Sequence, residues 1–168
     1  ASGLGYVASK DVFFENTNVA GTATWAYFKA VIKTPANLSD GTNDYTLRIG
    51  FADATGGGGA NDGAYFDYNH SNVSGNWGCN TTNAGSTQRN NTGVAVTTST
   101  TYVLEVVSRP DLTVEFYING TRVATNDTFV PSGTSDDLLV MSEIQKSIGT
   151  AQRDLTVYTM QTSIAFVK

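Results

Sequence analysis

The chain has little of three things that many functional sites need: cysteine, histidine and charge. Of its 168 residues one is cysteine (Cys79), one is histidine (His70), and only 15% are charged. A single cysteine excludes an internal disulfide and a zinc site made of several cysteines. Nothing basic adjoins Cys79 in the sequence to activate it, so we expect a buried or half-buried thiol with no chemical role.

Two further absences limit the partners. The ten lysine and arginine residues are scattered and the formal net charge is -5, so the chain lacks the basic patch that nucleic-acid binding requires. No apolar run approaches the roughly 20 residues of a membrane span, and the opening ASGLGYVASKD lacks the long apolar core of a signal peptide. We therefore expect neither nucleic acid nor membrane as a partner.

Short runs of Val, Ile, Tyr, Phe and Thr, separated by clusters of Gly, Asn, Asp and Ser, dominate the chain. This pattern is typical of an all-β protein. An acidic start makes 135–146 the best helix candidate, although its β-rich surroundings favour a strand or a turn. About ten strands in a single domain spanning 1–168 predict a two-sheet antiparallel β-sandwich or jelly roll. The predicted strands are 12–14, 24–33, 45–52, 64–68, 93–97, 101–108, 113–118, 121–124, 138–142 and 155–167.

One hairpin can be followed residue by residue, in TYVLEVVSRPDLTVEFYING at 101–120. If its strands pair symmetrically about Pro110, Leu104 faces Phe116 on the core side. The alternation of side chains then gives the hairpin one apolar and one mixed face. Asn119-Gly120 follows at once and predicts a tight turn into the next strand.

The continuation of this hairpin, FYINGTRVATN at 116–126, resembles the strand, turn and strand of concanavalin A-like lectin/glucanase domains, the laminin-G-like jelly roll. Three further stretches are similar to the version found in bacteriophage and virus structural proteins. The resemblance implies two antiparallel sheets, the front one curved, with ligands of relatives bound on its concave side or at rim loops. It does not imply one activity, because this fold hosts lectins, glycosidases, lyases and virion modules. The three stretches are LRIGFAD (47–53), GAYFDYNHSNVSGNWGCNTTNAGSTQRNNTGV (63–94) and KSIGTAQRDLTVY (146–158).

Four consecutive glycines interrupt the chain in DATGGGGANDG at 53–63. A phosphate cradle would need a following helix and a lysine, but a predicted strand follows and no G-K-S/T occurs. We expect a hairpin tip, which glycine suits because it tolerates positive φ.

The residues on either side of the four glycines offer hard oxygen ligands. Asp53, Asn61, Asp62 and Asp67 lie close in sequence and are candidates for a calcium site. Their spacing matches no EF-hand, and Asn, Asp and Gly clusters also form ordinary turns. Calcium binding and turn formation both remain open.

A sugar site needs an exposed aromatic platform beside planar hydrogen-bonding groups. If Phe66 points into the core, Tyr65, Asp67 and Asn69 share the opposite face of their strand. The alternative is that Tyr65 and Trp77 are ordinary buried aromatics. The full set of carbohydrate candidates is Tyr65, Asp67, Asn69, His70, Asn76, Trp77 and Tyr117.

An enzyme would depend on carboxylates. In the symmetric register Glu105 stands opposite Glu115 at about 5 Å, close to the spacing of a retaining glycosidase. A slip in register, or a neutralising Arg48, Arg89 or Arg109, would remove the pair.

The leading hypothesis is a non-enzymatic module on a virion surface or outside the cell, with host-surface glycans, other virion proteins and further copies of the chain as partners. The alternatives are a free lectin-like carbohydrate-binding module of a secreted protein, and a glycoside hydrolase or polysaccharide lyase that uses Glu105 and Glu115.

Overall fold

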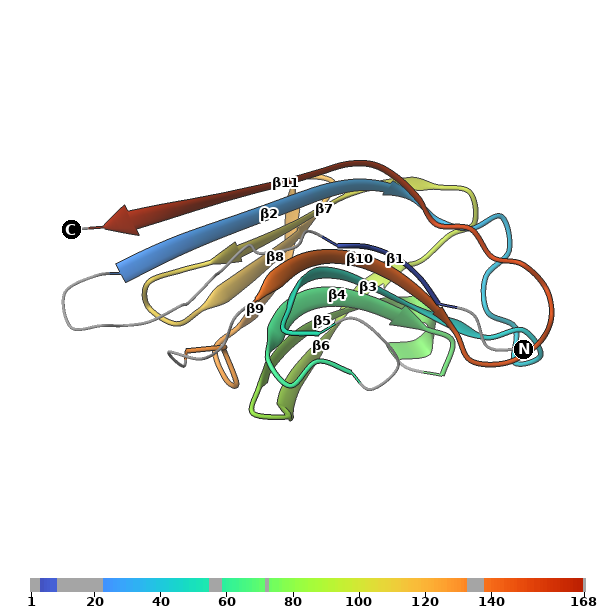
Figure 1. Ribbon diagram of the computed structural model, residues 1–168, viewed down its shortest axis with the longest axis horizontal. Helices are drawn as coiled ribbons and strands as arrows, with labels where there is room; N and C mark the ends of the chain where they lie inside the picture. The colour runs from blue at the N-terminus through green and yellow to red at the C-terminus, as the bar shows by residue number, and fades with distance from the viewer. Residues whose placement is uncertain (1–3, 9–22, 55–58, 72, 133–137, 168) are drawn as a thin grey trace.

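A computed structural model describes residues 4–8, 23–54, 59–71, 73–132 and 138–167 (Figure 1). These residues are almost entirely strands, and none of them forms a helix long and apolar enough to cross a membrane. A single short 3-10 turn, η1 (Val73–Gly75), is the one helical segment among them. The strands are β1 (Leu4–Ala8), β2 (Ala23–Lys33), β3 (Tyr45–Ala52), β4 (Gly63–Asn69), β5 (Asn76–Asn83), β6 (Ser86–Ala95), β7 (Thr101–Ser108), β8 (Val114–Ile118), β9 (Thr121–Asn126), β10 (Leu139–Lys146) and β11 (Thr156–Val167).

The strands form two antiparallel sheets stacked on each other, which confirms the predicted sandwich (Figure 1). One sheet has the order β1-β10-β3-β4-β5-β6 and the other β11-β2-β7-β8-β9. The six-stranded sheet is curved, and its concave side points away from the other sheet (Figure 1). We call this side the concave face; it carries Arg48, Asp67, Asn80, Arg89 and Glu143. The outer side of the five-stranded sheet, the back face, carries Trp25, Tyr27, Glu105, Glu115 and Tyr117.

Alternation along each strand separates the core from the two outer faces. In β3, Leu47 and Ile49 are fully buried while Thr46 and Arg48 point outward and are half-buried. Strand β7 follows the same rule, with Leu104 buried between less buried neighbours. This two-residue period is the physical reason why the sequence pattern predicted strands here.

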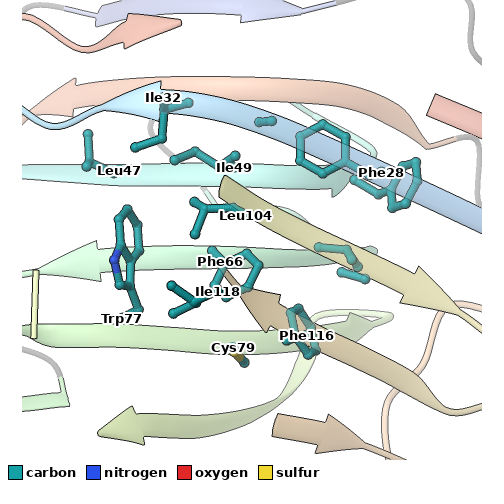
Figure 2. Packing of buried hydrophobic residues seen from close by; sticks show 14 of the residues in the cluster. Phe28, Ile32, Leu47, Ile49, Phe66, Trp77, Cys79, Leu104, Phe116 and Ile118 are labelled. Atoms are coloured by element: carbon teal, nitrogen blue, oxygen red, sulfur yellow. The ribbon is translucent and has the colours of Figure 1, made fainter. Parts of the chain in front are cut away.

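Aromatic side chains join the two sheets at the centre of the core (Figure 2). Phe66 of the six-stranded sheet packs edge-on against Phe116 of the other sheet, with ring centroids 5.3 Å apart. Trp77 contacts Tyr102 across the same interface at 5.5 Å. Cys79 is fully buried among them, and this burial raises the pKa of its thiol. The predicted burial of this cysteine is confirmed.

The predicted strand bounds hold best where apolar residues alternate strictly, as in β3 and β7. The predicted strand 12–14 lies outside the described residues. Strands β1 and β5 and most of β6 were not predicted. Strands β5 and β6 are rich in Asn and contain Gly, and both residues favour turns. The helix candidate within 135–146 is a strand from Leu139 onward.

The register of the β7–β8 hairpin differs from the symmetric prediction by two residues. Leu104 pairs with Ile118, and Phe116 pairs with Val106. The turn is longer than predicted, since the Arg109 N–H donates to the Thr113 carbonyl at 2.8 Å. A shift of two preserves the side-chain parity, so the predicted core face survives. The tight turn after β8 is confirmed by positive φ at both Asn119 and Gly120.

Candidate functional site

Two rows of residues cross the concave face because the strand register aligns them. One row runs from β10 to β6 through facing partners, and the second lies two residues further along each strand. The neighbouring strands are about 4.8 Å apart, so side chains in one row reach those in the next. The rows are Glu143–Arg48–Asp67–Gly78–Asn91 and Met141–Gly50–Tyr65–Asn80–Arg89.

The charged side chains of these rows form pairs. Arg48 Nη1 lies 3.1 Å from Glu143 Oε1, and Asp67 forms an ion pair with the Arg89 guanidinium. Asn80 Nδ2 donates a further hydrogen bond to Asp67 Oδ1 at 2.9 Å. The carboxylates are nearly inaccessible, Asp67 being 2% and Glu143 1% exposed, whereas a third of the Arg89 side chain is exposed. The face therefore presents an arginine held in place by groups beneath it.

Gly78 provides the space for this arrangement. A Cβ at Gly78 would lie 2.3 Å from Asp67 Oδ1, closer than any side chain tolerates. Without one, the Asp67 carboxylate lies across β5 and reaches Arg89 on β6. Partial burial of Arg89 lowers the pKa of its guanidinium, although an arginine remains charged at any ordinary pH.

Four of the predicted carbohydrate residues share the concave face: Tyr65, Asp67, Asn69 and Asn76. Asn69 Nδ2 donates to Thr46 Oγ1 at 2.9 Å, and Asn76 Nδ2 donates to Asn91 Oδ1 at 3.0 Å. His70 is exposed in the turn that follows β4. The sequence-based prediction therefore grouped the residues of β4 and the start of β5 correctly. In β4 the inward direction of Phe66 determines which side chains point outward.

None of the three aromatic residues among the predicted carbohydrate candidates forms an exposed platform on the concave face. Trp77 is fully buried in the core, because the same alternation that exposes Asn76 turns the next side chain inward. Tyr65 does face outward, but it is only 7% exposed and packs with Ala52 and Met141. Tyr117 lies on the back face, on the other sheet. No aromatic ring described on the concave face is open to solvent as a stacking platform.

The structure brings three of the predicted calcium ligands, Asp53, Asn61 and Asp62, to one loop and leaves the fourth, Asp67, apart. Asp53 Oδ1 accepts the Asn61 N–H at 3.1 Å, and Asp62 Oδ1 accepts the Ala84 N–H at 2.8 Å. Asp67 lies on the sheet, in its pair with Arg89. Among the described residues no group of three or more His, Cys, Asp or Glu side chains is placed to hold a metal. A site shared by all four residues is therefore not formed, because Asp67 lies on the sheet. Asp53 and Asp62 use side-chain oxygens to hold the turns of the loop, and calcium binding by the remaining three residues stays a prediction.

The predicted glutamate pair is also wrong, because of the two-residue shift. Glu105 faces Tyr117, and Glu115 faces Val107. Glu115 is bound by three donors on the back face: the Arg109 guanidinium, Arg122 Nη1 at 2.9 Å and the Tyr117 hydroxyl at 2.8 Å.

These contacts fix the ionisation of the back-face groups. The hydrogen bond from Arg109 is the main cause that lowers the pKa of Glu115. Glu105 accepts the Tyr27 hydroxyl and lies 3.8 Å from Lys29 Nζ. Burial, followed by Glu105, raises the pKa of Tyr27 to about 12. Arg109 also lies over the Trp25 ring, 4.7 Å from its centroid. Each glutamate thus has its own cationic partners: Lys29 for Glu105, and Arg109 and Arg122 for Glu115.

Sequence reasoning did not select Arg48, Asn80, Arg89 or Glu143 as site residues. Arg48 interrupts the apolar alternation of LRIGFA, and this signal places it on the outer face. Asn80 and Arg89 lie on the strands whose composition favours turns, and Glu143 lies in the segment that also read as a helix.

The fold and this face define a concanavalin A-like jelly roll, as the sequence resemblance implied. Residues 6–157 match the family model described as SO2946-like, C-terminal domain, and the chain belongs to that family. A search of curated protein sequences gives no significant match.

Solved structures share the architecture at low sequence identity. SO2946 of Shewanella oneidensis, a protein of unknown function, is 16% identical with a TM-score of 0.56, over 98% of this chain and 79% of that chain. The carbohydrate recognition domain of Emp46p in its potassium-bound form has 7% identity and a TM-score of 0.60, over 96% and 87%. The β-glucanase of Bacillus licheniformis has 13% identity and a TM-score of 0.54, over 89% and 69%. At these identities the likeness shows the fold alone.

Proposed function

We propose that the domain is a non-catalytic carbohydrate-binding module whose ligand lies on the concave face. The observation that carries the proposal is the fixed Asp67–Asn80–Arg89 group. It presents a partly exposed guanidinium on an open, curved sheet, held by an almost fully buried carboxylate. Groups fixed before binding lose little freedom when a ligand arrives.

The polar rim of the face fits a ligand with many hydroxyl groups. Asn91 is exposed beside Arg89. Thr46 near the start of β3 and Asn69 at the end of β4 are half-buried. Amide and guanidinium groups are planar donors and acceptors, which suit the hydroxyl rim of a sugar. Because Tyr65 is nearly buried, recognition would depend on hydrogen bonds more than on stacking. The carbohydrate recognition domain of Emp46p, which has this fold, supports the ligand class.

The carboxylates of this face argue for binding rather than hydrolysis. Asp67 and Glu143 stand two strands apart with Arg48 between them, at about 10 Å, beyond the roughly 5 Å of a retaining pair. Each is also ion-paired and nearly inaccessible, whereas a general acid or nucleophile must reach the substrate.

A glycan array followed by calorimetry on the best ligand tests the proposal. Arg89→Ala should weaken binding at least tenfold, since it removes a charge-assisted hydrogen bond. Asn91→Ala, which leaves Asp67 paired, should weaken binding several-fold without lowering the melting temperature. Arg122→Ala removes an exposed arginine from the opposite side of the molecule and should bind as the wild type does. No binding to any glycan on a broad array, or binding by Arg89→Ala as tight as that of the wild type, would contradict the proposal.

The phage-like resemblance supports a finer proposal, that the module is displayed on a virion or outside a cell and binds host-surface glycans there. Other virion proteins and further copies of the chain are the partners that such a display implies. The neighbouring genes test this: capsid or tail genes support it, whereas genes for secreted enzymes favour a free lectin-like module.

A further inference from the structure

A cavity lies at the end of the sandwich where β2 ends and β11 begins. This end of the two strands is at the right of Figure 1. Its volume is about 340 Å³, within the roughly 300–1,000 Å³ of small-molecule sites and near their lower limit. Its wall comes from three places in the sequence: the end of β2, the β6–β7 turn and the segment before β11. The lining residues that matter chemically are Lys33, Asn37, Ser99, Gln152, Arg153 and Asp154.

Hydrogen bonds hold two of these walls together. The Thr34 N–H donates to the Thr100 carbonyl at 3.0 Å, and the Ser99 N–H donates to the Pro35 carbonyl at 3.0 Å. These bonds tie the end of β2 to the β6–β7 turn. The cavity is therefore bounded by fixed backbone on that side, as a preformed site is.

The third wall is fixed to the rest of the fold as well. The Ala151 N–H donates to Asn43 Oδ1 at 3.1 Å, and Lys146 Nζ donates to the Ala151 carbonyl at 2.6 Å. Both bonds anchor the segment that carries Gln152 and Arg153 to elements outside the cavity.

The cations of the cavity wall are only loosely paired. Arg153 is 8% exposed, its Nε is buried without a hydrogen-bond partner, and its nearest carboxylate oxygen, Asp40 Oδ2, is 3.9 Å away. Within the described residues, Lys33 makes no ion pair. The one carboxylate in the wall, that of Asp154, accepts a hydrogen bond from Gln152 Nε2 at 2.9 Å. Arg153 thus has one distant carboxylate partner, Asp40, and one hydrogen bond, to the Gln152 carbonyl, whereas Lys33 has no carboxylate partner among the described residues.

We propose that this cavity binds the anionic group of a small polyol, a sugar acid or a sugar phosphate. Lys33 supplies the accessible cation, and the buried Arg153 adds positive potential from behind the wall, where low polarity strengthens its effect. Asn37, Ser99 and Gln152 supply the amide and hydroxyl groups that hydroxyls of the ligand need. The proposal is independent of carbohydrate binding on the concave face.

Titrations of the whole domain, followed by amide chemical shifts, test the proposal. The probes are sodium glucuronate, glucose 6-phosphate and glucose. Saturable shifts at Ser99 and Gln152 are expected with either or both anionic probes, and the probe that binds more tightly identifies the anion. Glucose should bind at least about tenfold more weakly, since it lacks the charge. Equal binding of all three, or shifts confined to the concave face, would overturn the proposal.

The matched variants are Lys33→Gln and Lys29→Gln, two lysines on one strand and one face. Lys33→Gln keeps most of the side-chain length and should weaken binding of the anionic probe at least about tenfold. Lys29→Gln should not change it, because Lys29 lies beside Glu105. Unchanged binding by Lys33→Gln with an unaltered melting temperature would overturn the assignment.

Discussion

The concave face and the back face both carry nearly buried carboxylates held by arginines, but they assemble these groups from different distances along the chain. On the concave face, Arg48 and Glu143 are 95 residues apart, and Asn80 is 13 residues from its acceptor Asp67. On the back face, Glu115 takes its donors from residues only 6, 2 and 7 positions away. The back-face cluster therefore belongs to a single meander, β7–β8–β9. On the concave face, the Asp67–Asn80–Arg89 group lies on the meander β4–β5–β6, but the adjoining Arg48–Glu143 pair exists only when β10 pairs with β3.

The difference indicates different roles. A local cluster can stabilise the hairpins that carry it, because its members are neighbours as soon as the strands pair. The Arg48–Glu143 pair contributes nothing until β10 has paired with β3, and burying the charges of the concave face costs free energy of its own. Its placement on an open, curved face is the reason to assign the ligand there.

The largest expected effect comes from breaking the concave cluster. Asp67→Ala leaves Arg89 without its ion-pair partner and removes the shorter of the two hydrogen bonds that the buried Asn80 amide donates. Urea denaturation should show a loss of about 3 kcal/mol in unfolding free energy; the 3–5 kcal/mol of a fully buried pair is reduced because Arg89 is partly exposed. Asp127→Ala, at an exposed position, should change it by about 0.5 kcal/mol or less. The double variant Asp67→Ala/Arg89→Ala should recover part of the loss. A loss below about 1 kcal/mol for Asp67→Ala would mean that the cluster is not a buried network.

How much of the fold the sequence predicts depends on the composition of each strand. LRIGFA places apolar residues at every second position, so its period and facing follow from the pattern. TYVLEVVS is a run of mostly aromatic and β-branched residues broken by one glutamate, which predicts a strand and places Glu105 on the outer face. NWGCNTTN shows neither pattern, because its burial rests on Trp77, Cys79 and threonines that carry no strong strand signal. The β7–β8 register required the true length of the turn, which Pro110 alone does not determine.

The concave-face site could be predicted only for residues whose direction follows from the alternation of side chains along one strand. Tyr65, Asp67 and Asn69 follow from the inward direction of Phe66. Arg89 lies opposite Asn80 only because of the β5–β6 register, which contains an irregularity between Asn76 and Gly78 that the sequence does not reveal. The partnership of Arg48 with Glu143 depends on β10 pairing with β3 across most of the chain, which no local pattern encodes.

A smaller effect is expected at Glu115, and it depends on pH. Because the pKa of Glu115 is lowered in the folded state, its contribution to stability is present above its ordinary pKa of 4.5 and is lost as pH falls through the folded value. Glu115→Gln should lower the unfolding free energy near pH 7 by about 1–2 kcal/mol, the worth of charge-assisted hydrogen bonds. Melting curves from about pH 6 down to about pH 3 should show the difference from wild type shrinking. A difference that stays constant over this range would assign the loss to packing instead of charge.

The smallest effect is expected at Arg122, which tests the back-face side of the comparison most directly. Its side chain is 59% exposed, and Glu115 retains Arg109 and the Tyr117 hydroxyl without it. Arg122→Ala should therefore lower the unfolding free energy by about 0.5 kcal/mol or less, and by less still in 0.5 M NaCl, because exposed ion pairs are screened. Urea midpoints at low and high salt measure both quantities. A loss above about 1 kcal/mol that persists in salt would show that the back-face cluster acts as one buried network. The contrast between a back-face cluster that tolerates substitution and a concave-face cluster that does not would then fail.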